Sequence, residues 1–304
     1  MKIIFLGTPN FAIPSLRAIA ETSNEIVAVI TQPDKPGNRR VMTPPPVKVE
    51  AEKMGLPVYQ FSSIRKEGVD LIKTLAPDLM VTAAFGQIIS QEILDIPKYG
   101  TFNVHGSLLP KYRGSSPIQQ CLLNGDTVTG VTIMRTALAV DSGDIVLKKE
   151  IPIALTDTAG TLFGKISELG ASAIVEAIEL LARGKVFFTP QDHSQATFCK
   201  MISKADAFIS SETDVITSIR KIRAYNPWPV AYVMIDGERL RLFNAVEAEK
   251  KGVAGSFYSG NDLLYLNLSD GAIGVSEVQA EGKKVMSARE YLMGHKDILA
   301  KSIE

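Results

Sequence analysis

The sequence is poor in the residues that build metal sites and disulfide frameworks. It has two cysteines, Cys121 and Cys199, and three histidines in 304 residues. Two cysteines cannot form a disulfide framework, so we expect a reducing compartment. The histidines are far apart in the chain, and no HxH, HExxH or CxxC spacing occurs. The sequence therefore predicts no metal site.

An excess of charge of one sign and long apolar runs are also missing. Lysine and arginine number 33, as do aspartate and glutamate, so the formal net charge is zero. Any binding of nucleic acid must then come from local patches. The apolar run after Lys2 is far too short for a signal peptide, and no stretch approaches the roughly 20 apolar residues of a membrane helix. These absences predict a soluble, cytoplasmic protein.

Three common catalytic sequences do not occur. A dinucleotide fingerprint GxGxxG needs three glycines in the first turn, and the turn after the first predicted strand offers only Gly7. Neither a phosphate-binding GxxxxGK[ST] nor the GxSxG of serine hydrolases is present. A dinucleotide site, an ATP site and a serine nucleophile are therefore disfavoured.

The first part of the chain alternates between short apolar strands and amphipathic helices. The predicted strands cover residues 2–7, 25–32, 56–60, 78–86 and 101–105, and the predicted helices cover 11–22, 46–55, 68–76 and 90–95. Continuous apolar strands that alternate with helices are typical of a buried, parallel sheet. The pattern predicts an α/β fold with a Rossmann-like, doubly wound, mostly parallel sheet.

The pattern changes after residue 114. Two strands flank the turn in "VDSGD", and a long helix is predicted over 156–185, with Thr156 or Asp157 as N-cap and Gly184 past its end. A helix over 214–225 then precedes several short strands between residues 230 and 285, which suggest a small OB-like β-barrel. We therefore predict a catalytic domain over 1–188, a linker over 189–207 and a β-barrel domain over 208–304.

Polar side chains gather at two predicted strand ends. Asn103 and His105 alternate with apolar residues, so both point to one side of the strand that Gly106 ends. Asp141 follows a later strand, beside a turn. Taken singly, such a histidine is more often structural, and such an aspartate often bonds its own turn. Together they suit acyl transfer, because Asn and His can donate to an oxyanion while Asp orients the imidazole.

Longer stretches resemble one known family. The string "NVHGSLLPKYRG", followed by "VDSGDI", resembles the folate-dependent formyltransferases. The segments "IIFLGTPNFAIPSL" and "AAFGQIIS" are similar to the family's opening strand and its folate-pocket segment. The segments "RAYNPWPVAY" and "VQAEGKKVMSAREYLMG" resemble the C-terminal domain of its tRNA-modifying branch, which single-domain relatives lack. The resemblance covers nearly the whole chain.

The resemblance implies a reaction and a catalytic trio. A formyl group would move from 10-formyltetrahydrofolate to the α-amino group of methionine on initiator tRNA, without a metal. Asn103, His105 and Asp141 would be the catalytic residues. A free amine can attack the formyl carbon directly, which agrees with the missing serine or cysteine nucleophile. The protein is expected to act as a monomer.

Folate is expected to lie along irregular main chain, whose donors and acceptors match a pterin edge. The resemblance implies three segments for it: Phe85, Gly86, Gln87, Ile88 and Ile89; Ser107, Leu108, Leu109 and Pro110; Ala139 and Val140. Core packing is the alternative for the four aliphatic residues of the first two segments. The proline-ended loop favours a pocket for Leu108 and Leu109, whereas Ile88 and Ile89 fit the core easily.

Contact with tRNA is expected in the basic loop "DKPGNRRVMTPPP", through Lys35, Arg39 and Arg40. The alternative is a solvated charged loop.

Other functions stay open: a sugar-nucleotide N-formyltransferase has the same trio without the "NPWP" domain, and a glycinamide ribonucleotide formyltransferase is shorter. A non-catalytic folate- or RNA-binding module is a further alternative, which the intact trio disfavours.

Overall fold

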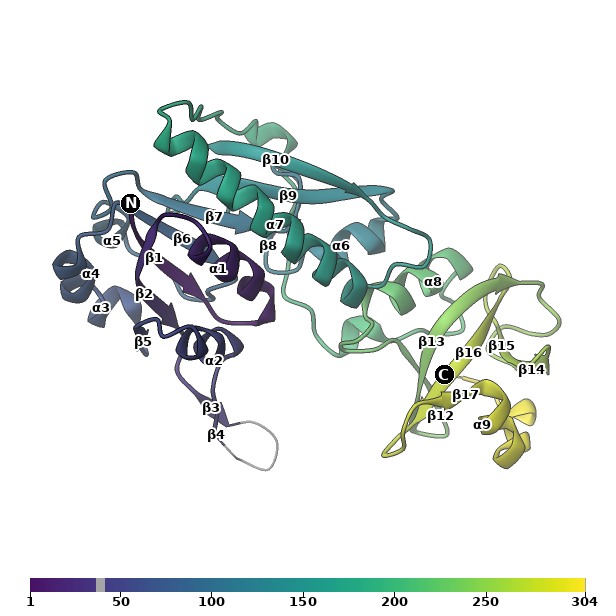
Figure 1. The fold of residues 1–304 in the computed structure, drawn as a ribbon. Helices are drawn as coiled ribbons and strands as arrows, with labels where there is room; N and C mark the ends of the chain where they lie inside the picture. Colours follow the sequence, from purple (N-terminus) through teal and green to yellow (C-terminus); the bar gives the residue numbers. More distant parts are fainter. Residues whose placement is uncertain (37–41, 304) are drawn as a thin grey trace. The chain divides into compact units, whose positions relative to one another are not determined.

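A computed structural model describes residues 1–36 and 42–303, and it divides into two compact units (Figure 1). Unit 1 comprises residues 1–117, 128–152 and 163–199. Unit 2 comprises residues 118–127, 153–162 and 200–304. The candidate catalytic residues Asn103, His105 and Asp141 all belong to unit 1.

Unit 1 is built on a seven-stranded sheet with the order β10-β9-β7-β6-β1-β2-β5 (Figure 1). The strands are β1 (Lys2–Gly7), β2 (Glu25–Thr31), β5 (Val58–Gln60), β6 (Leu79–Ala83), β7 (Thr101–His105), β9 (Val128–Arg135) and β10 (Ile145–Pro152). The five strands from β5 to β7 are parallel, whereas β9 and β10 are antiparallel to their neighbours. The predicted Rossmann-like, mostly parallel sheet is confirmed.

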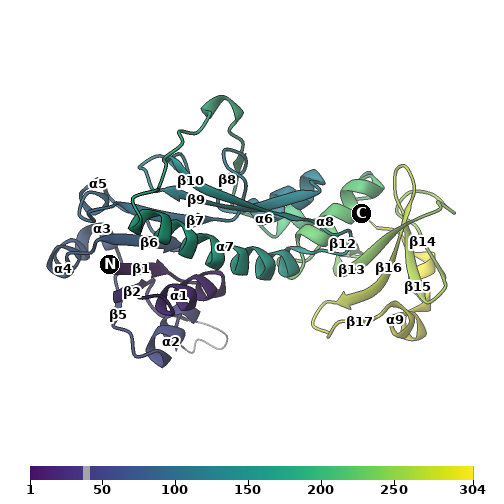
Figure 2. The ribbon, with the colours of Figure 1, turned by 45° about the horizontal axis from the view of Figure 1, so that its top comes forward.

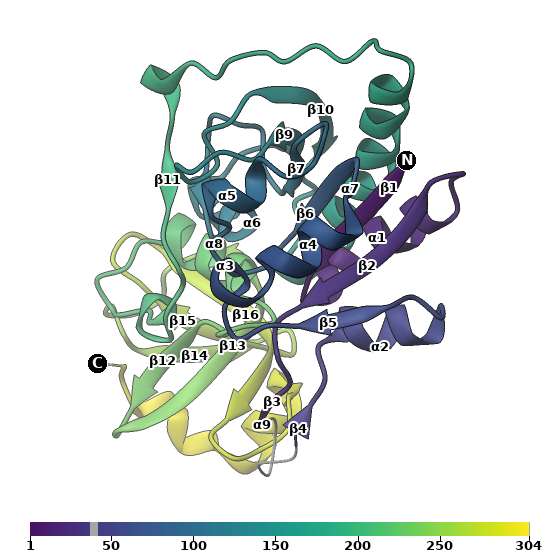
Figure 3. The ribbon, with the colours of Figure 1, turned by 90° about the vertical axis from the view of Figure 1, so that its left-hand side faces the viewer.

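Helices cover both faces of this sheet (Figure 3). They are η1 (Asn10–Ala12), α1 (Ile13–Ala20), α2 (Pro46–Lys53), α3 (Ile64–Glu67), α4 (Val69–Leu75), α5 (Gln91–Leu94) and α7 (Ala159–Ala182). One core cluster joins Ile4 and Leu6 of β1 to Ile72 of α4 and Ile93 of α5. On the α1 side, Ser167 of α7 donates a hydrogen bond to the Phe11 carbonyl at 2.8 Å. The sheet is thus buried on both faces, as its apolar strands predict.

The long helix α7 begins later than the sequence suggests. Its first residue is Ala159, and the Thr158 hydroxyl accepts the Thr161 N–H at 3.3 Å, so Thr158 and not Thr156 or Asp157 is the N-cap. Asp157 instead accepts the Thr161 hydroxyl at 2.8 Å. Gly184 follows the helix with φ +64°, as predicted.

No helix among the described residues is long and apolar enough to cross a membrane.

A glycine lets α7 lie close to the strand that carries the candidate residues (Figure 2). A Cβ atom at Gly170 would lie 2.7 Å from Cγ1 of Val104 on β7. Val104 lies between Asn103 and His105 on the opposite face of the strand. The missing side chain therefore sets the distance between α7 and β7.

Replacement of two glycines of α7 by alanine should change the free energy of unfolding in opposite directions. Gly170→Ala is expected to lower the free energy of unfolding by about 1–3 kcal/mol, because the methyl group overpacks against Val104. Gly164→Ala meets open space in the same helix and should raise it by up to about 1 kcal/mol. Urea unfolding of both variants measures this, and equal effects would show that Gly170 does not set the packing.

Unit 2 is a curled antiparallel sheet with the order β12-β13-β16-β15-β14, and β17 pairs with β16. Its strands are β12 (Tyr232–Ile235), β13 (Glu238–Ala248), β14 (Phe257–Gly260), β15 (Leu263–Asn267), β16 (Ala272–Ala280) and β17 (Met286–Ser287). With α8 (Val215–Ala224) it matches the predicted second domain, an OB-like half-barrel. The unit also contains α6 (Pro117–Asn124) and η4 (Ala205–Ala207).

The helix α9 (Ala288–Gly294) was not predicted, although the sequence "SARE" marks its start. The Ser287 hydroxyl accepts the Glu290 N–H, and the Glu290 carboxylate accepts the Ser287 N–H, which forms a capping box. The element η5 (Lys296–Ala300) follows α9.

The segment predicted as a linker, residues 189–207, has defined structure in its first part. Thr189 exchanges two main-chain hydrogen bonds with Ile145 at the start of β10, at 2.8 and 2.9 Å. The segment η3 (His193–Gln195) follows, and β11 (Phe198–Cys199) then pairs in parallel with β8 (Arg113–Gly114). Residues 189–199 therefore belong to unit 1, and unit 2 continues from residue 200. Their pairing is long-range, which explains why local periodicity did not reveal it.

Candidate active site

Asn103 and His105 lie where β7 ends, at the carboxyl edge of the parallel strands. Asn103 is opposite Thr82 of β6 and Met134 of β9, and His105 is opposite Thr132 of β9. Both side chains belong to the same face of the strand, since residues two apart share a face. This edge is where open α/β sheets place their ligands.

The carboxamide of Asn103 is oriented by its neighbour on β6. The Thr82 hydroxyl donates to Asn103 Oδ1 at 2.8 Å. That contact occupies the acceptor end of the amide, so the Nδ2 group is the end that can donate. Asn103 thus offers a fixed N–H donor at the edge of the sheet.

The imidazole of His105 is buried, with 6% of its surface exposed, and one ring nitrogen is already occupied. Nε2 lies 2.9 Å from the carbonyl oxygen of Tyr112. A carbonyl only accepts, so this nitrogen carries a proton and donates. Nδ1 is left facing Oδ2 of Asp141 at 3.6 Å.

Asp141 reaches this position from the loop between β9 and β10. Its Oδ2 accepts the Gly114 N–H at 2.8 Å and lies 3.6 Å from the imidazole, the distance of an ion pair when His105 is protonated. The backbone of Asp141 is left-handed, with φ +48°. The structure therefore brings Asp141 to His105, which lies beside Asn103 on β7, as the sequence predicts.

Gly114 is a part of this arrangement that the sequence did not reveal. Its φ is +115°, and a Cβ atom there would collide with the carbonyl oxygen of Cys199 on β11. Only glycine can therefore present its N–H to Asp141 at this point. Burial raises the pKa of the neighbouring Cys199 thiol, whose Sγ donates to the Arg113 carbonyl at 3.3 Å. This cysteine is thus a packed residue and a poor nucleophile.

The segment from Phe85 to Ile89 begins just after β6, at the same edge. Phe85 and Ile89 are buried in the core, whereas Ile88 is 73% exposed. Gln32 Nε2 donates to the carbonyls of Phe85 and Gly86 at 3.2 and 3.1 Å. The segment is thus anchored at its start and presents an apolar side chain at its middle, so Ile88 is not a core residue.

The leucines of the loop from Ser107 to Pro110 pack inward. Leu109 is fully buried with Met134 and Ile145, and a Cδ atom of Leu108 lies against Gly130 of β9. The Thr132 hydroxyl donates to the Ser107 carbonyl at 2.7 Å and accepts the Leu109 N–H at 3.0 Å. The Leu109 side chain is therefore part of the core, and these hydrogen bonds fold the loop onto β9.

Comparisons with known proteins show the family of the chain. Residues 1–178 match the model of the formyl transferase family, and residues 201–296 match the model of the formyl transferase C-terminal domain. This chain belongs to the formyl transferase family.

Relatives that align over nearly their whole length are named methionyl-tRNA formyltransferase. One from Desulfotalea psychrophila is 44% identical over 301 residues, which cover 97% of this chain and 93% of the relative. One from Macrococcus caseolyticus is 42% identical over 301 residues, 98% of this chain and 97% of the relative. The resemblance read from the sequence is confirmed.

Solved structures of more distant proteins have the same fold. HypX from Aquifex aeolicus, in complex with tetrahydrofolic acid, aligns with a TM-score of 0.65 and 19% identity, over 97% of this chain and 47% of that one. WlaRD, a sugar 3N-formyl transferase, aligns with a TM-score of 0.67 and 20% identity, over 93% of this chain and 99% of that one. At these identities the likeness supports the fold alone.

Of the three residues that the sequence suggests for tRNA, the structure describes one. Lys35 lies in β3 (Lys35–Pro36), which pairs with β4 (Met42–Thr43). It is exposed, and its ammonium donates to Gln32 Oε1 at 2.6 Å. Arg39 and Arg40 lie outside the described residues.

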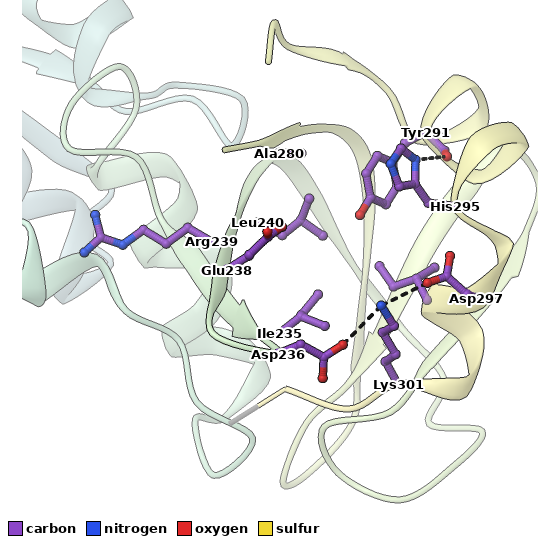
Figure 4. A pocket seen from close by; sticks show the side chains of 11 residues that line it. Ile235, Asp236, Glu238, Arg239, Leu240, Ala280, Tyr291, His295, Asp297 and Lys301 are labelled. Atoms are coloured by element: carbon purple, nitrogen blue, oxygen red, sulfur yellow. Dashed lines mark hydrogen bonds and ion pairs between the residues drawn. The ribbon is translucent and has the colours of Figure 1, made fainter. Parts of the chain in front are cut away.

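A pocket of about 260 Å³ in unit 2 offers different chemistry (Figure 4). Lys301 bridges Asp236 and Asp297 at 3.1 and 2.9 Å, and these carboxylates raise the pKa of its ammonium. These three charged groups of the pocket thus satisfy one another. Across residues 1–36 and 42–303, no group of three or more His, Cys, Asp or Glu side chains is placed to hold a metal.

Two glycines with positive φ allow a test of the contact at Asp141. Gly114→Ala should abolish most turnover and destabilise the protein, because the methyl group displaces the main chain that binds Asp141. Gly55→Ala has φ +71° but open space, so it should cost only about 1–2 kcal/mol and leave turnover intact. Turnover and unfolding are measured for both, and an active Gly114→Ala enzyme would contradict the role of this contact.

Proposed function

We propose that the protein is a methionyl-tRNA formyltransferase. It transfers the formyl group of 10-formyltetrahydrofolate to the α-amino group of methionine on initiator tRNA, and N-formylmethionyl-tRNA is used to begin translation in the cytoplasm. The observation that carries the proposal is the meeting of Asp141 with His105 beside Asn103, at the sheet edge of a formyl transferase. Identities of 41–44% to enzymes of that name, over nearly the whole chain, support it.

The nucleophile is the amine of the substrate itself. A free α-amino group has a pKa of about 7.7–8.0, so a useful neutral fraction exists near pH 7. The amine attacks the formyl carbon, and the carbonyl oxygen becomes an oxyanion. Asn103 Nδ2 is the donor for that oxygen, since Thr82 already holds Oδ1.

His105 acts through Nδ1, because Tyr112 occupies Nε2. At 3.6 Å the Asp141 carboxylate is too far to accept a hydrogen bond from Nδ1, so a protonated Nδ1 is free to donate to the oxyanion while the carboxylate stabilises the charged ring. One proton must move from the attacking amine to N10 of the folate as the C–N10 bond breaks. Asp141 accepts that proton, directly or through water, and returns it to the leaving nitrogen.

The folate is placed along the edge that carries the trio. The exposed side chains of Ile88 and Val140, at 73% and 64%, provide apolar surface on two of the three predicted segments. No hydrogen bond joins the main chain of Ile88 to another described residue, so its N–H and C=O are available to a pterin. For Ser107 to Pro110, where Thr132 already binds main chain, a role in binding folate stays a prediction.

We assign catalysis to residues 1–188 and assistance in tRNA binding to residues 208–304. Lys35, Arg39 and Arg40 are proposed to contact the RNA backbone. The sugar-nucleotide alternative is not favoured, because the sugar formyltransferases among the solved structures are only 18–20% identical to this chain.

Loss of a catalytic side chain should slow chemistry without weakening tRNA binding. Asn103→Ala, His105→Ala and Asp141→Ala should each lower kcat about a hundredfold or more, because each group acts on the transition state. His295→Ala, which removes an exposed histidine of unit 2, should retain wild-type kcat. Formylation of charged initiator tRNA is measured at saturation, and near-normal kcat in His105→Ala would refute the assignment.

Neutralising Lys35, Arg39 and Arg40 together should weaken tRNA binding. Each lost phosphate contact should also reduce the slope of log K against log salt by roughly 0.7–0.9. Folate affinity should stay constant, since no predicted folate segment lies in this loop. Binding of charged tRNA is measured at several salt concentrations, and identical slopes would show that the loop does not touch RNA.

A further inference from the structure

Two buried polar side chains that no catalytic step uses meet beside Asp141. Gln191 and Arg113 are 6% and 5% exposed, and both belong to unit 1. Gln191 follows Thr189, whose main chain pairs with Ile145 at the start of β10. Arg113 begins β8, and its N–H donates to the carbonyl of Thr197 at 2.9 Å. Burial of such groups is costly unless their hydrogen bonds are made.

The carboxamide of Gln191 binds the loop that contains Asp141 and Gly143 on one side and the guanidinium of Arg113 on the other. Its Nε2 donates to the carbonyls of Asp141 and Gly143 at 2.9 and 2.7 Å. Its Oε1 accepts from Nε and Nη2 of Arg113 at 3.1 and 2.6 Å. Rotation of the amide by 180° would set its NH₂ group against the guanidinium. The orientation of Gln191 is therefore unique.

Arg113 in turn is fixed by neutral acceptors. Besides Gln191, its Nη2 contacts Nδ1 of His193 at 3.0 Å. A guanidinium only donates, so Nδ1 of His193 is the acceptor. The residue after Arg113 is Gly114, whose N–H binds the Asp141 carboxylate at 2.8 Å. Asp141 is thus held at its main chain through Gln191 and at its side chain by Gly114.

The loop needs such support. Asp141 is in the left-handed conformation, with φ +48°, which aspartate adopts more readily than most residues but which still costs energy for a residue with a side chain. Its neighbours Leu138 and Val140 are largely exposed and contribute little packing. The contact of 3.6 Å between Asp141 and His105 therefore depends on hydrogen bonds rather than on a core.

We propose that Arg113 and Gln191 are positioning residues for this reaction: their buried hydrogen-bond chain holds Asp141 at the distance that its pairing with His105 requires. Neither side chain touches substrate. The inference rests on the proposed function, since it assumes that Asp141 and His105 are catalytic.

Gln191→Glu separates positioning from packing. A carboxylate retains the acceptor for Arg113, and with better charge pairing, but it cannot donate to the two loop carbonyls. We expect kcat to fall about 10- to 100-fold with the KM values for folate and tRNA within about twofold, as for a misplaced catalytic group. Arg113→Lys keeps the positive charge but loses the planar pair of N–H donors that binds Gln191. It should lower kcat in the same way by a smaller factor.

A control makes the same chemical change at an exposed glutamine of the same segment. Nε2 of Gln195 donates to Oδ2 of Asp192 at 2.8 Å. Gln195→Glu should leave kcat unchanged. Thermal unfolding and binding of tetrahydrofolate verify that each variant is folded.

The ¹⁵N resonances of the His105 ring report the geometry without turnover. In Gln191→Glu the Nδ1 signal should move toward that of an Asp141→Asn protein, whereas a purely structural role would leave it unchanged. A folded variant with wild-type kcat and wild-type resonances would overturn the proposal, and so would a rise in KM alone. Unfolding of both variants would likewise overturn it, since it would show that these residues serve the fold.

The two hypotheses fail in different ways. A wild-type protein that does not formylate charged initiator tRNA would sink the proposed function, whatever the variants do. An active wild type with variants of equal kcat would reject only the positioning role.

Discussion

The pairing of Asp141 with His105 depends on how one loop is held against the end of one strand. His105 is placed by β7, a central strand that is paired on both sides. Asp141 has no such support, because it lies between β9 and β10 with a left-handed backbone. The hydrogen bonds that reach it come from Gly114 and Gln191, which are far from it in the chain. These contacts accompany an approach of 3.6 Å between the carboxylate and the imidazole.

This constraint explains features that are otherwise hard to understand. The short parallel pair β8–β11 places Arg113 and Gly114 beside the segment that follows Gln191. Gly114 must be glycine because the Cys199 carbonyl occupies the space of a side chain. A buried guanidinium with neutral acceptors costs desolvation energy. That cost is consistent with a site that needs rigidity where the hydrophobic core provides none.

The apolar side chains near the strand ends are of two kinds, buried and exposed. Leu109 closes the core against Met134 and Ile145, so the loop after His105 is anchored. Ile88 and Val140 are exposed, on segments next to strand ends. Under the proposed function, these are side chains that folate would cover.

The sequence by itself determined the parallel sheet, the second antiparallel domain and the placement of Asn103 and His105 on one face of a strand, because each depends on local information. Apolar runs and turns define strands such as β1 and β6, and alternation along β7 sets Asn103 and His105 on one face. Even α9 was marked by the local capping pair Ser287 and Glu290.

Only the tertiary structure decided the rest. The sequence shows that Leu109 and Ile88 are apolar. Whether each is buried depends on which strand its loop folds over. The roles of Gln191, Arg113 and Gly114 arise from hydrogen bonds that span 27 to 78 residues. Such hydrogen bonds leave no periodic pattern in the sequence, because their partners come together only when the intervening chain folds into a closed loop.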